Sequence, residues 1–258
     1  MELKIFDSHA HYDDESFDED RDKVIEEIRN EGVIGVLNCG SSIEGARASF
    51  ELSKKYDFFY AAVGVHPEYA DKVNDEVLKE IEDMTSFHKV KAIGEIGLDY
   101  YWESNPPKEV QKEAFRKQMN LARKLNLPVV IHDRDAHKDT LDILKEFKEV
   151  NGVVHCFSGS PEFAKECLKI GYYIGFTGVV TFKNAKKILE VAKEVPLNRI
   201  LLETDCPYMA PTPYRGKRNQ SNYIKYMAEK IAEIKEISIE DLNNQATQNI
   251  KRLLNMEL

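Results

Sequence analysis

The sequence lacks the features that would place a protein in a membrane or in an oxidising compartment. It contains no run of about eighteen apolar residues, the length that a membrane-spanning helix requires. Its start, MELKIFDSHAHYDD, has no basic segment followed by an apolar stretch of the kind that directs secretion. Its four cysteines, Cys39, Cys156, Cys167 and Cys206, form no C-x-x-C pair, so neither a zinc knuckle nor a dithiol redox site is predicted. We therefore expect a soluble, cytoplasmic protein that does not associate with membranes.

Low-complexity segments, proline-rich linkers and sequence repeats are also absent, so nothing divides the chain into parts. Its 258 residues match the length of one eight-fold α/β barrel, and residues 1–258 are predicted to form a single domain. The formal net charge is −9. An acidic surface repels phosphate polymers unless positive charge or metal is concentrated locally, which excludes extended wrapping of duplex nucleic acid.

Eight apolar runs bounded by turn residues predict eight strands. They lie at residues 3–9, 33–39, 58–65, 90–96, 128–132, 152–156, 172–178 and 199–204. The runs are continuous rather than alternating in polarity, which is typical of parallel strands that are covered on both faces. The segments between them carry apolar residues at helical spacing, such as Val24, Ile25 and Ile28. This alternation of strands and helices indicates an α/β fold with a parallel sheet.

Such a sheet can close into a barrel or remain open and doubly wound. No G-x-G-x-x-G motif follows the first strand, so no dinucleotide site supports the open form, and a (β/α)8 TIM barrel is favoured. Two helices, around 221–235 and 239–254, are predicted after the last strand, the second with Ser238 as its N-cap. We expect both to complete the outer ring, which gives a single TIM barrel with an extra C-terminal helix.

Polar residues stand where several of the predicted strands end. In TIM barrels, catalytic side chains come from the carboxyl ends of different strands. Six residues at these ends carry metal-binding atoms: His9, His11, Glu95, His132, His155 and Asp205. His9 and His11 have the spacing that sends both side chains to one face of a strand. Four imidazoles and two carboxylates suit Zn²⁺, Mn²⁺, Co²⁺ or Mg²⁺, and the set could hold two divalent ions with Glu95 as a possible bridge.

The ordered motifs D-S-H-A-H, G-V-H-P, G-E-I-G-L-D-Y, I-H-D-R-D-A, H-C-F-S-G and L-E-T-D-C-P-Y resemble the TatD family of metal-dependent deoxyribonucleases. This family is a branch of the amidohydrolase superfamily, and the resemblance runs the length of the chain. It implies that His9 and His11 bind one metal and that His132 and His155 bind the other. It also implies that Glu95 bridges the two metals and that Asp205 is both a ligand and the general base, which makes these two carboxylates the catalytic residues.

The activity that the resemblance implies is hydrolysis of phosphodiester bonds, as a 3′-to-5′ exonuclease on single-stranded DNA or RNA. Water held between two cations loses its proton near neutral pH, and the hydroxide attacks phosphorus while Asp205 accepts the proton. The cations also neutralise charge that develops on the transferring group. The prediction is therefore a divalent-metal-dependent hydrolase that acts as a deoxyribonuclease.

Further residues near the same rim are candidates for substrate contacts. His66 ends the third predicted strand and could donate to the substrate, although a loop histidine that fixes a turn is the alternative. Arg215, Lys217 and Arg218 follow the last strand and are expected to grip a nucleic acid backbone, because arginine binds phosphate bidentately. Family members usually continue this stretch with Glu-Pro, whereas this chain has Gln-Ser, so any contact of that glutamate is missing here.

Neighbours of the candidate ligands have weaker expectations. Glu203 lies two residues before Asp205 and either orients a ligating imidazole or is a buried structural carboxylate. The aromatic run at 100–102 could stack on bases, although aromatic loop residues commonly pack on neighbouring helices. Cys156 and Cys206 each follow a candidate ligand and are expected to face the core, because neighbouring strand residues point to opposite faces.

Two other functions stay open on the residues alone. The first is a hydrolase that uses the same metals on an ester or amide, such as a D-aminoacyl-tRNA deacylase or a small-ring amidohydrolase. The cations at 215–218 favour a phosphate-bearing substrate over a small neutral one. The second is a non-catalytic binding module, which is disfavoured because polar groups gathered at one site are costly without metal or substrate. Nucleic acid is the expected partner, and no obligate protein partner is indicated.

Overall fold

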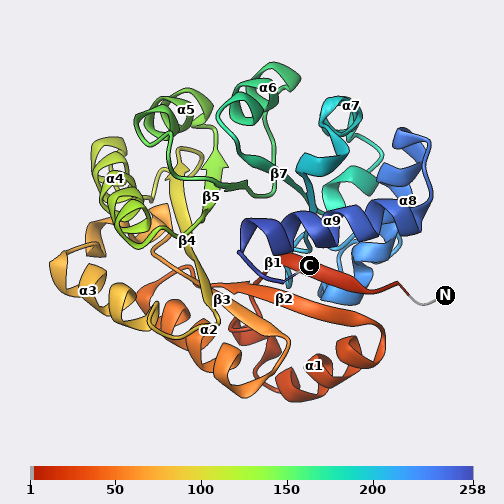
Figure 1. The fold of residues 1–258 in the computed structure, drawn as a ribbon, viewed down its shortest axis with the longest axis horizontal. Helices are drawn as coiled ribbons and strands as arrows, with labels where there is room; N and C mark the ends of the chain where they lie inside the picture. Colours follow the sequence, from red (N-terminus) through yellow and green to blue (C-terminus); the bar gives the residue numbers. More distant parts are fainter. Residues whose placement is uncertain (1–2, 258) are drawn as a thin grey trace.

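The computed structural model describes residues 3–257, so both ends of the predicted 1–258 domain lie outside the described residues. Within these residues eight strands form one sheet in sequence order, and each neighbouring pair is parallel. The strands are β1 Ile5–Ala10, β2 Val33–Cys39, β3 Phe59–Val63, β4 Val90–Asp99, β5 Val129–Arg134, β6 Gly152–Val154, β7 Tyr173–Phe176 and β8 Ile200–Leu202. Figure 1 shows the strands at the centre with the helices around them. This confirms the predicted TIM barrel.

The helices alternate with the strands along the chain. The α-helices are α1 Arg21–Asn30, α2 Ile43–Lys55, α3 Asp75–Met84, α4 Lys108–Leu125, α5 His137–Glu146, α6 Pro161–Lys169, α7 Lys186–Glu194, α8 Ile224–Lys235 and α9 Ile239–Leu253. None of the helices between residues 3 and 257 is both long enough and apolar enough to cross a membrane.

Short polar side chains begin several of these helices. Ser42, Asn74 and Ser160 each accept a hydrogen bond from the backbone N–H three residues further on. Such a cap satisfies one of the donors that the first turn of a helix leaves unpaired. Ser238 accepts from the backbone N–H of Asp241 at 3.0 Å, which confirms the predicted N-cap of α9.

The barrel interior is apolar at the end opposite to the carboxyl ends of the strands. Every strand contributes to a cluster there: Phe6, Leu37, Cys39, Ala62, Ala92, Val130, Val153, Tyr173 and Leu201. Ile250, Leu253 and Leu254 from the end of α9 belong to the same cluster. Helix α9 therefore covers this end of the barrel (Figure 1), which corrects the expectation that both C-terminal helices complete the outer ring. Its apolar face keeps water from a layer that the strands alone would leave exposed.

The barrel closes between β1 and the segment that follows β8. The backbone N–H of Asp205 donates to the carbonyl of His9 at 3.0 Å, and the N–H of His11 donates to the carbonyl of Cys206 at 2.8 Å. A parallel bridge joins Ala10 to Cys206 at the same place. Closure therefore brings candidate ligands from the first and last strands side by side.

Four strands, β3, β6, β7 and β8, each end two residues earlier than their apolar runs predicted. β6 ends at Val154 and β8 at Leu202, so His155 and Asp205 belong to the segments that follow them. Cys156 has a φ of 41°, where the alternation of a strand no longer holds. It is half-buried and lines a cavity beside the candidate site, so the prediction that it faces the core was wrong. Cys206 is fully buried, as expected.

Candidate metal centre

The carboxyl ends of the strands bring six polar side chains into one cluster, and these are the six predicted ligands: His9, His11, Glu95, His132, His155 and Asp205. Five of them are buried, and His132 is half-buried. Ligand atoms within 4.8 Å of one another occur in the group of His9, His11 and Asp205 and in the group of His9, Glu95 and His155. Residues far apart in the sequence therefore meet at one site.

Glu95 lies between two pairs of histidines. Its Oε1 is 2.7 Å from Nδ1 of His132 and 2.7 Å from Nε2 of His155. Its Oε2 is 3.2 Å from Nε2 of His9 and 3.6 Å from Nε2 of His11. Each carboxylate oxygen thus faces a different pair of imidazoles, which is the arrangement that a carboxylate shared by two cations needs.

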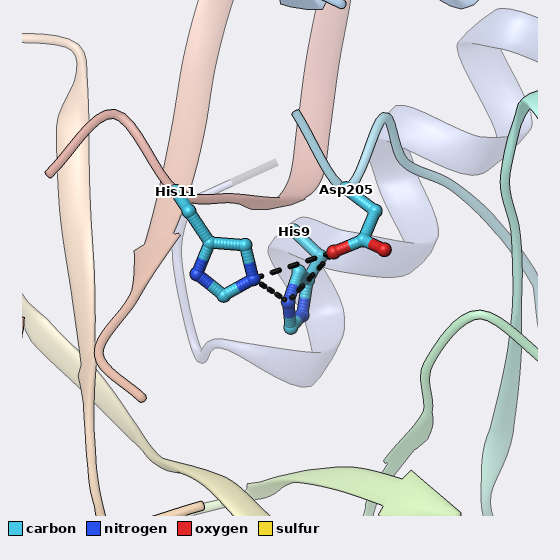
Figure 2. Close-up of side chains that lie close together, drawn as sticks. All are labelled: His9, His11 and Asp205. Carbon is cyan, nitrogen blue, oxygen red and sulfur yellow. Dashed lines mark hydrogen bonds and ion pairs between the residues drawn. The ribbon is translucent and has the colours of Figure 1, made fainter. Parts of the chain in front are cut away.

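Asp205 faces His9, which lies in β1, and His11, which directly follows β1. Its Oδ1 is 3.3 Å from Nε2 of His11 and 3.7 Å from Nε2 of His9. Figure 2 shows the two imidazoles and the carboxylate pointing toward one another. His11 Nδ1 lies 2.8 Å from the carbonyl of Cys39. Because a carbonyl only accepts, Nδ1 carries the proton and the lone pair of Nε2 in the neutral imidazole faces the cluster.

Asp7, buried below this group, joins the two ends of the barrel. Its Oδ1 accepts from the backbone N–H of Thr204 at 2.9 Å. Its Oδ2 accepts from the hydroxyls of Thr204 at 2.5 Å and Ser221 at 2.7 Å. These hydrogen bonds offset only part of the cost of burying this carboxylate, because burial still raises the pKa of Asp7 to about 6, and they fix the segment that carries Asp205 against β1.

Asp99 is a site residue to which the sequence analysis assigned no role. Its Oδ2 lies 3.1 Å from Nε2 of His132, while Nδ1 of that imidazole faces Glu95. A carboxylate that accepts from one ring nitrogen leaves the other nitrogen free to bind metal. A usable signal was present, because Asp99 lies four residues after Glu95 and an even separation places both on one face of β4.

Burial and close charges shift the pKa values of the histidines in opposite directions. Burial and the neighbouring His155 lower the pKa of His9 to about 4. At His11 burial is outweighed by the hydrogen bond to Asp205 and the charge of Glu95, which raise its pKa to about 10. At His132 burial is outweighed by the contacts with Asp99 and Glu95, which raise its pKa to about 9. The imidazoles of His11 and His132 are thus each held by a pair of carboxylates.

The donor set fits divalent cations. Burial would raise the pKa of Glu95, but the neighbouring His155 and His9 hold it well below its usual range. The Glu95 oxygen atoms that face these imidazoles are the ones that a cation would contact. A bound metal replaces the protons that its ligands would otherwise carry. Nitrogen and carboxylate donors without a thiolate suit Zn²⁺, Mn²⁺, Co²⁺ or Mg²⁺.

Glu203 lies behind His155 and is fully buried. Its Oε1 accepts from the backbone N–H of Cys156 and lies 3.7 Å from Nδ1 of His155. Burial raises the pKa of this carboxyl to about 8. The distance to the imidazole exceeds that of a hydrogen bond, so Glu203 contacts the backbone next to His155, and its role in orienting that imidazole stays a prediction.

His66 stands beside the cluster, at the start of a short 3-10 helix at Pro67–Lys72. Its Nδ1 accepts from the backbone N–H of Glu68 at 3.2 Å, and its Nε2 is 3.8 Å from Oε1 of Glu95. Burial and the nearby His132 lower its pKa to about 3, so the imidazole is neutral. The contact that fixes the following turn is therefore present, and donation from Nε2–H to the substrate stays a prediction.

The predicted basic residues lie away from the cluster. None of Arg215, Lys217 and Arg218 lines either of the two cavities that contain the ligands. Arg218 donates through both terminal nitrogens to Asp20 at 2.7 Å. The guanidinium of Arg215 lies 4.3 Å from the ring centroid of Phe182. A phosphate contact by Arg218 would have to compete with its carboxylate partner.

Two cavities meet at the ligands and share His132, Arg134, His155, Asp205 and Met209. One has a volume of about 410 Å³ and an apolar wall that includes Phe157, Val179 and Ile188. The other has a volume of about 460 Å³ and is lined by Glu95, Asp99, Trp102 and Tyr208 among others. Concave sites of this size bind small molecules or single groups of a larger substrate.

Comparison with known proteins extends over nearly the whole chain. A family model described as TatD related DNase matches residues 6–255. YabD of Bacillus subtilis (strain 168), an uncharacterized metal-dependent hydrolase, is 48% identical over 251 residues, which cover 96% of this chain and 98% of that protein. YcfH of Escherichia coli (strain K12), also an uncharacterized metal-dependent hydrolase, is 38% identical over 259 residues, which cover 98% of this chain and 96% of that protein.

The fold has close counterparts among solved structures. The crystal structure of YjjV, a TatD homologue from Escherichia coli K12, is similar with a TM-score of 0.92 and 29% sequence identity, and the match covers 100% of both chains. The similarity in sequence and the similarity in fold therefore extend over the same residues, including all six candidate ligands.

Proposed function

The chain belongs to the TatD-related DNase family of metal-dependent hydrolases, and from this we propose that it is a nuclease that hydrolyses phosphodiester bonds in nucleic acid. Single-stranded DNA or RNA, shortened from its 3′ end, is the substrate that the family resemblance favours. The observation that carries the proposal is the position of Glu95, whose two oxygens each face one pair of imidazoles. Phosphodiester hydrolysis commonly uses two cations held in this way.

In this proposal His9 and His11 hold one cation, His132 and His155 hold the other, and Glu95 is shared. Asp205 adds a carboxylate to the first pair. When bound, the two cations lower the pKa of water and neutralise charge on the transferring phosphoryl group. The native metal is one of Zn²⁺, Mn²⁺, Mg²⁺ or Co²⁺.

The protein's own groups move the proton and orient the phosphate. Asp205 lines both cavities, and its carboxylate accepts the proton of the attacking water. His66 presents Nε2–H at the rim, where it donates to a phosphate oxygen. Arg134 also lines both cavities and would add a positive side chain beside the scissile phosphate. Arg215 and Lys217 would contact phosphates further along the strand.

A second candidate is hydrolysis of an ester or amide, including the ester of a D-aminoacyl-tRNA or the bond of a small ring. The observation in its favour is the cavity beside His155, whose wall of Phe157, Val179 and Ile188 would accept an apolar acyl group. The nuclease is preferred because the family description names a DNase.

The test compares wild-type protein with an Asp205→Asn variant, each stripped of metal and reloaded with Mg²⁺, Mn²⁺ or Zn²⁺. End-labelled single-stranded DNA and RNA are the substrates, and an Asp57→Asn variant is the matched control because Asp57 pairs with Arg29 on the surface. The nuclease predicts stepwise shortening that needs metal, that Asp205→Asn loses by at least about a hundredfold, and that Asp57→Asn keeps.

Other results would redirect the assignment. If metal-loaded wild-type protein releases no nucleotide from DNA or RNA but cleaves an ester or a D-aminoacyl-tRNA, the second candidate replaces the first. If the protein purifies without a stoichiometric divalent ion and cleaves none of these substrates, it is a binding module rather than a hydrolase.

A further inference from the structure

Exposed aromatic side chains gather at the end of the barrel that carries the metal ligands. Among the described residues, the large hydrophobic side chains that are more than a third exposed are Ile34, Tyr69, Tyr101, Trp102, Tyr208 and Met209. All except Ile34 lie in segments that follow the carboxyl ends of β3, β4 or β8. A cluster of exposed apolar groups at one end of a molecule marks a contact surface.

Trp102 and Tyr208 differ from the other exposed aromatics because both line the cavity that contains the ligands. They are 54% and 53% exposed. Trp102 follows β4 and Tyr208 follows β8, strands on opposite sides of a closed eight-stranded barrel. Glu95 and Asp205 line the same cavity. The cavity therefore runs from one aromatic ring across the metal ligands to the other.

The segment that carries Trp102 is built by specific contacts. The two oxygens of Asp99 have different partners, since Oδ1 accepts from the backbone N–H of Tyr101 at 2.9 Å and Oδ2 contacts His132. The guanidinium of Arg134 lies 3.9 Å from the ring centroid of Tyr101 and 5.5 Å from that of Trp102. The same carboxylate thus orients a candidate metal ligand and the aromatic segment.

Tyr208 is anchored on the other side of the cavity. Its hydroxyl donates to Oδ2 of Asp14 at 2.7 Å, and its ring centroid is 6.3 Å from that of His11 in an edge-on arrangement. The carbonyl of Tyr208 accepts from the side-chain amide of Asn219 at 2.7 Å. The ring of Tyr208 is thus exposed, although its hydroxyl and its backbone carbonyl are both fixed by hydrogen bonds. An exposed ring with a fixed orientation can stack on a planar ligand.

The side chains of the protein supply little positive charge in this cavity. Arg134 is the only lysine or arginine among the residues that line this cavity, and the whole chain carries a formal charge of −9. Beyond the cations of the proposed metal centre, contacts other than ion pairs would then add to the affinity for a nucleic acid. Stacking of bases on aromatic rings is such a contact, and it does not depend on phosphate charge.

We propose that Trp102 and Tyr208 are base-stacking positions on the two sides of the metal ligands, and that they bind the nucleobases adjoining the scissile phosphodiester. This inference rests on the proposed nuclease function and says which part of the substrate the protein recognises. Stacking tolerates any base, so cleavage is expected with little sequence preference. A duplex whose bases are already stacked and paired would have to open before it could bind.

The first test is kinetic and uses the metal-loaded enzyme. Its substrates are an oligothymidylate and an oligomer of the same length in which tetrahydrofuran residues replace the nucleosides, so that phosphates are kept and bases are removed. Wild-type enzyme is expected to have a KM about tenfold or more lower for the oligothymidylate. Trp102→Ala and Tyr208→Ala are each expected to raise that KM by about tenfold and to reduce the preference for base-bearing substrate.

Three further variants separate stacking from misfolding. Trp102→Phe and Tyr208→Phe keep a ring, and each should retain most of the preference that the alanine variant loses. Tyr69→Ala is the matched control, because Tyr69 is 38% exposed on the same end of the barrel but does not line the cavity. It should keep the wild-type KM for both oligomers.

The second test reports stacking directly. Trp102 is the only tryptophan of the chain, so intrinsic tryptophan fluorescence comes from this position alone. In metal-loaded Asp205→Asn protein, which is expected to bind without turnover, the oligothymidylate should quench this fluorescence and the base-free oligomer should not. The quenching does not require the protein to be a nuclease.

The outcomes separate the stacking positions from the nuclease activity. Equal KM values of wild-type enzyme for both oligomers would contradict base stacking by Trp102 and Tyr208, as would a Trp102→Ala variant that keeps the full preference for the oligothymidylate. Neither result would contradict the proposed nuclease function. Absence of cleavage of either oligomer by wild-type enzyme would overturn the nuclease, and the fluorescence titration would then decide on the stacking positions. Equal quenching by both oligomers, or none by either, would count against them.

Discussion

At the scale of single residues, two carboxylates on β4 determine how the histidines are arranged. Glu95 contacts imidazoles directly through both oxygens, whereas Asp99 contacts the nitrogen of His132 that faces away from Glu95. A ligand imidazole whose second nitrogen donates to a carboxylate is held in one tautomer and one orientation. In the proposed metal centre the two residues would therefore have separable roles, Glu95 as a shared ligand and Asp99 as a positioning group.

Replacing Asp99 by Asn is expected to weaken metal affinity about 10- to 100-fold, because the amide lacks the charge that fixes the His132 tautomer. Metal titration of the stripped protein measures the effect. Asp83→Asn is a control of the same type, since Asp83 pairs with Lys79 on the surface. Wild-type metal affinity in the Asp99 variant would show that His132 needs no such orientation.

Arg218 and Lys217 are adjacent but should respond differently to substitution. Arg218 pairs with Asp20 and also donates to the carbonyl of Ser16. Its replacement by Ala is expected to lower the free energy of unfolding by about 1 kcal/mol or less, because the pair is partly exposed.

Lys217→Ala should instead weaken the affinity for nucleic acid, by an amount that depends on the salt concentration, and leave the free energy of unfolding unchanged.

The pH dependence of the Arg218 effect has a defined sign. The Arg218 guanidinium holds the pKa of Asp20 below its usual range. A depressed carboxyl pKa contributes stability above the unfolded-state value of about 4, and that contribution is lost as the pH falls through the folded-state value. The difference in Tm between wild type and Arg218→Ala should therefore be present at neutral pH and shrink in acid. The guanidinium of Arg218 also lies 4.6 Å from the ring centroid of Phe17. A constant difference in Tm would mean that Arg218 acts through this packing rather than through its pair with Asp20.

At the scale of the elements, apolar patterning predicted where strands and helices lie but not where each one ends. β2 has the predicted bounds, Val33–Cys39. β4 continues to Asp99 although the pattern ended at 96, because Leu98 and Asp99 pair with Asp133 and Arg134 of β5. Pairing with a neighbouring strand extends an element through residues whose own polarity would end it.

The candidate ligands could be predicted because parallel strands place their carboxyl ends at one rim, whatever their register. Contacts between residues distant in sequence could not. To predict the contact of Asp99 with His132, one would have to know the register between β4 and β5. The ion pair of Arg218 with Asp20 joins residues that lie 198 positions apart in the sequence. The positive φ of Cys156 could not be predicted either, because it depends on how the segment after β6 turns.

Helix α9 gives a prediction at this scale. Leu253 is buried in the layer that α9 covers, so Leu253→Ala is expected to cost about 2–5 kcal/mol of unfolding free energy. Thermal unfolding should show a Tm lower by about 4–20 °C, while turnover per folded molecule stays at the wild-type value. Arg252→Ala, at the exposed neighbouring position, is the control. Loss of turnover in folded Leu253→Ala protein would show that the apolar layer also positions the site.

At the scale of the whole molecule, the barrel keeps its packing and its chemistry at opposite ends. One end of the interior is filled by side chains from every strand together with the end of α9. The other end collects imidazoles and carboxylates that are buried close to one another. Burying these groups without cations is unfavourable, so metal binding and folding stability should be linked.

Removal of metal is therefore expected to lower the Tm of the protein. A ligand at a hundredfold excess over its Kd adds about 2.7 kcal/mol of stability, which corresponds to roughly 5–10 °C for a chain of this size. Thermal unfolding with a chelator, and again after metal is restored, measures the difference. An unchanged Tm would mean that the cluster does not bind the added ion with useful affinity.

Metal content is the measurement that decides most directly whether Glu95 joins two cations at one site. Wild-type protein and a Glu95→Gln variant are each loaded with Mn²⁺ or Zn²⁺, freed of excess metal and analysed for metal per chain. We predict about two ions per wild-type chain and at most about one in the variant, because Gln cannot offer a charged oxygen to both histidine pairs. About one ion in both proteins would contradict the shared ligand, as would two ions retained by Glu95→Gln.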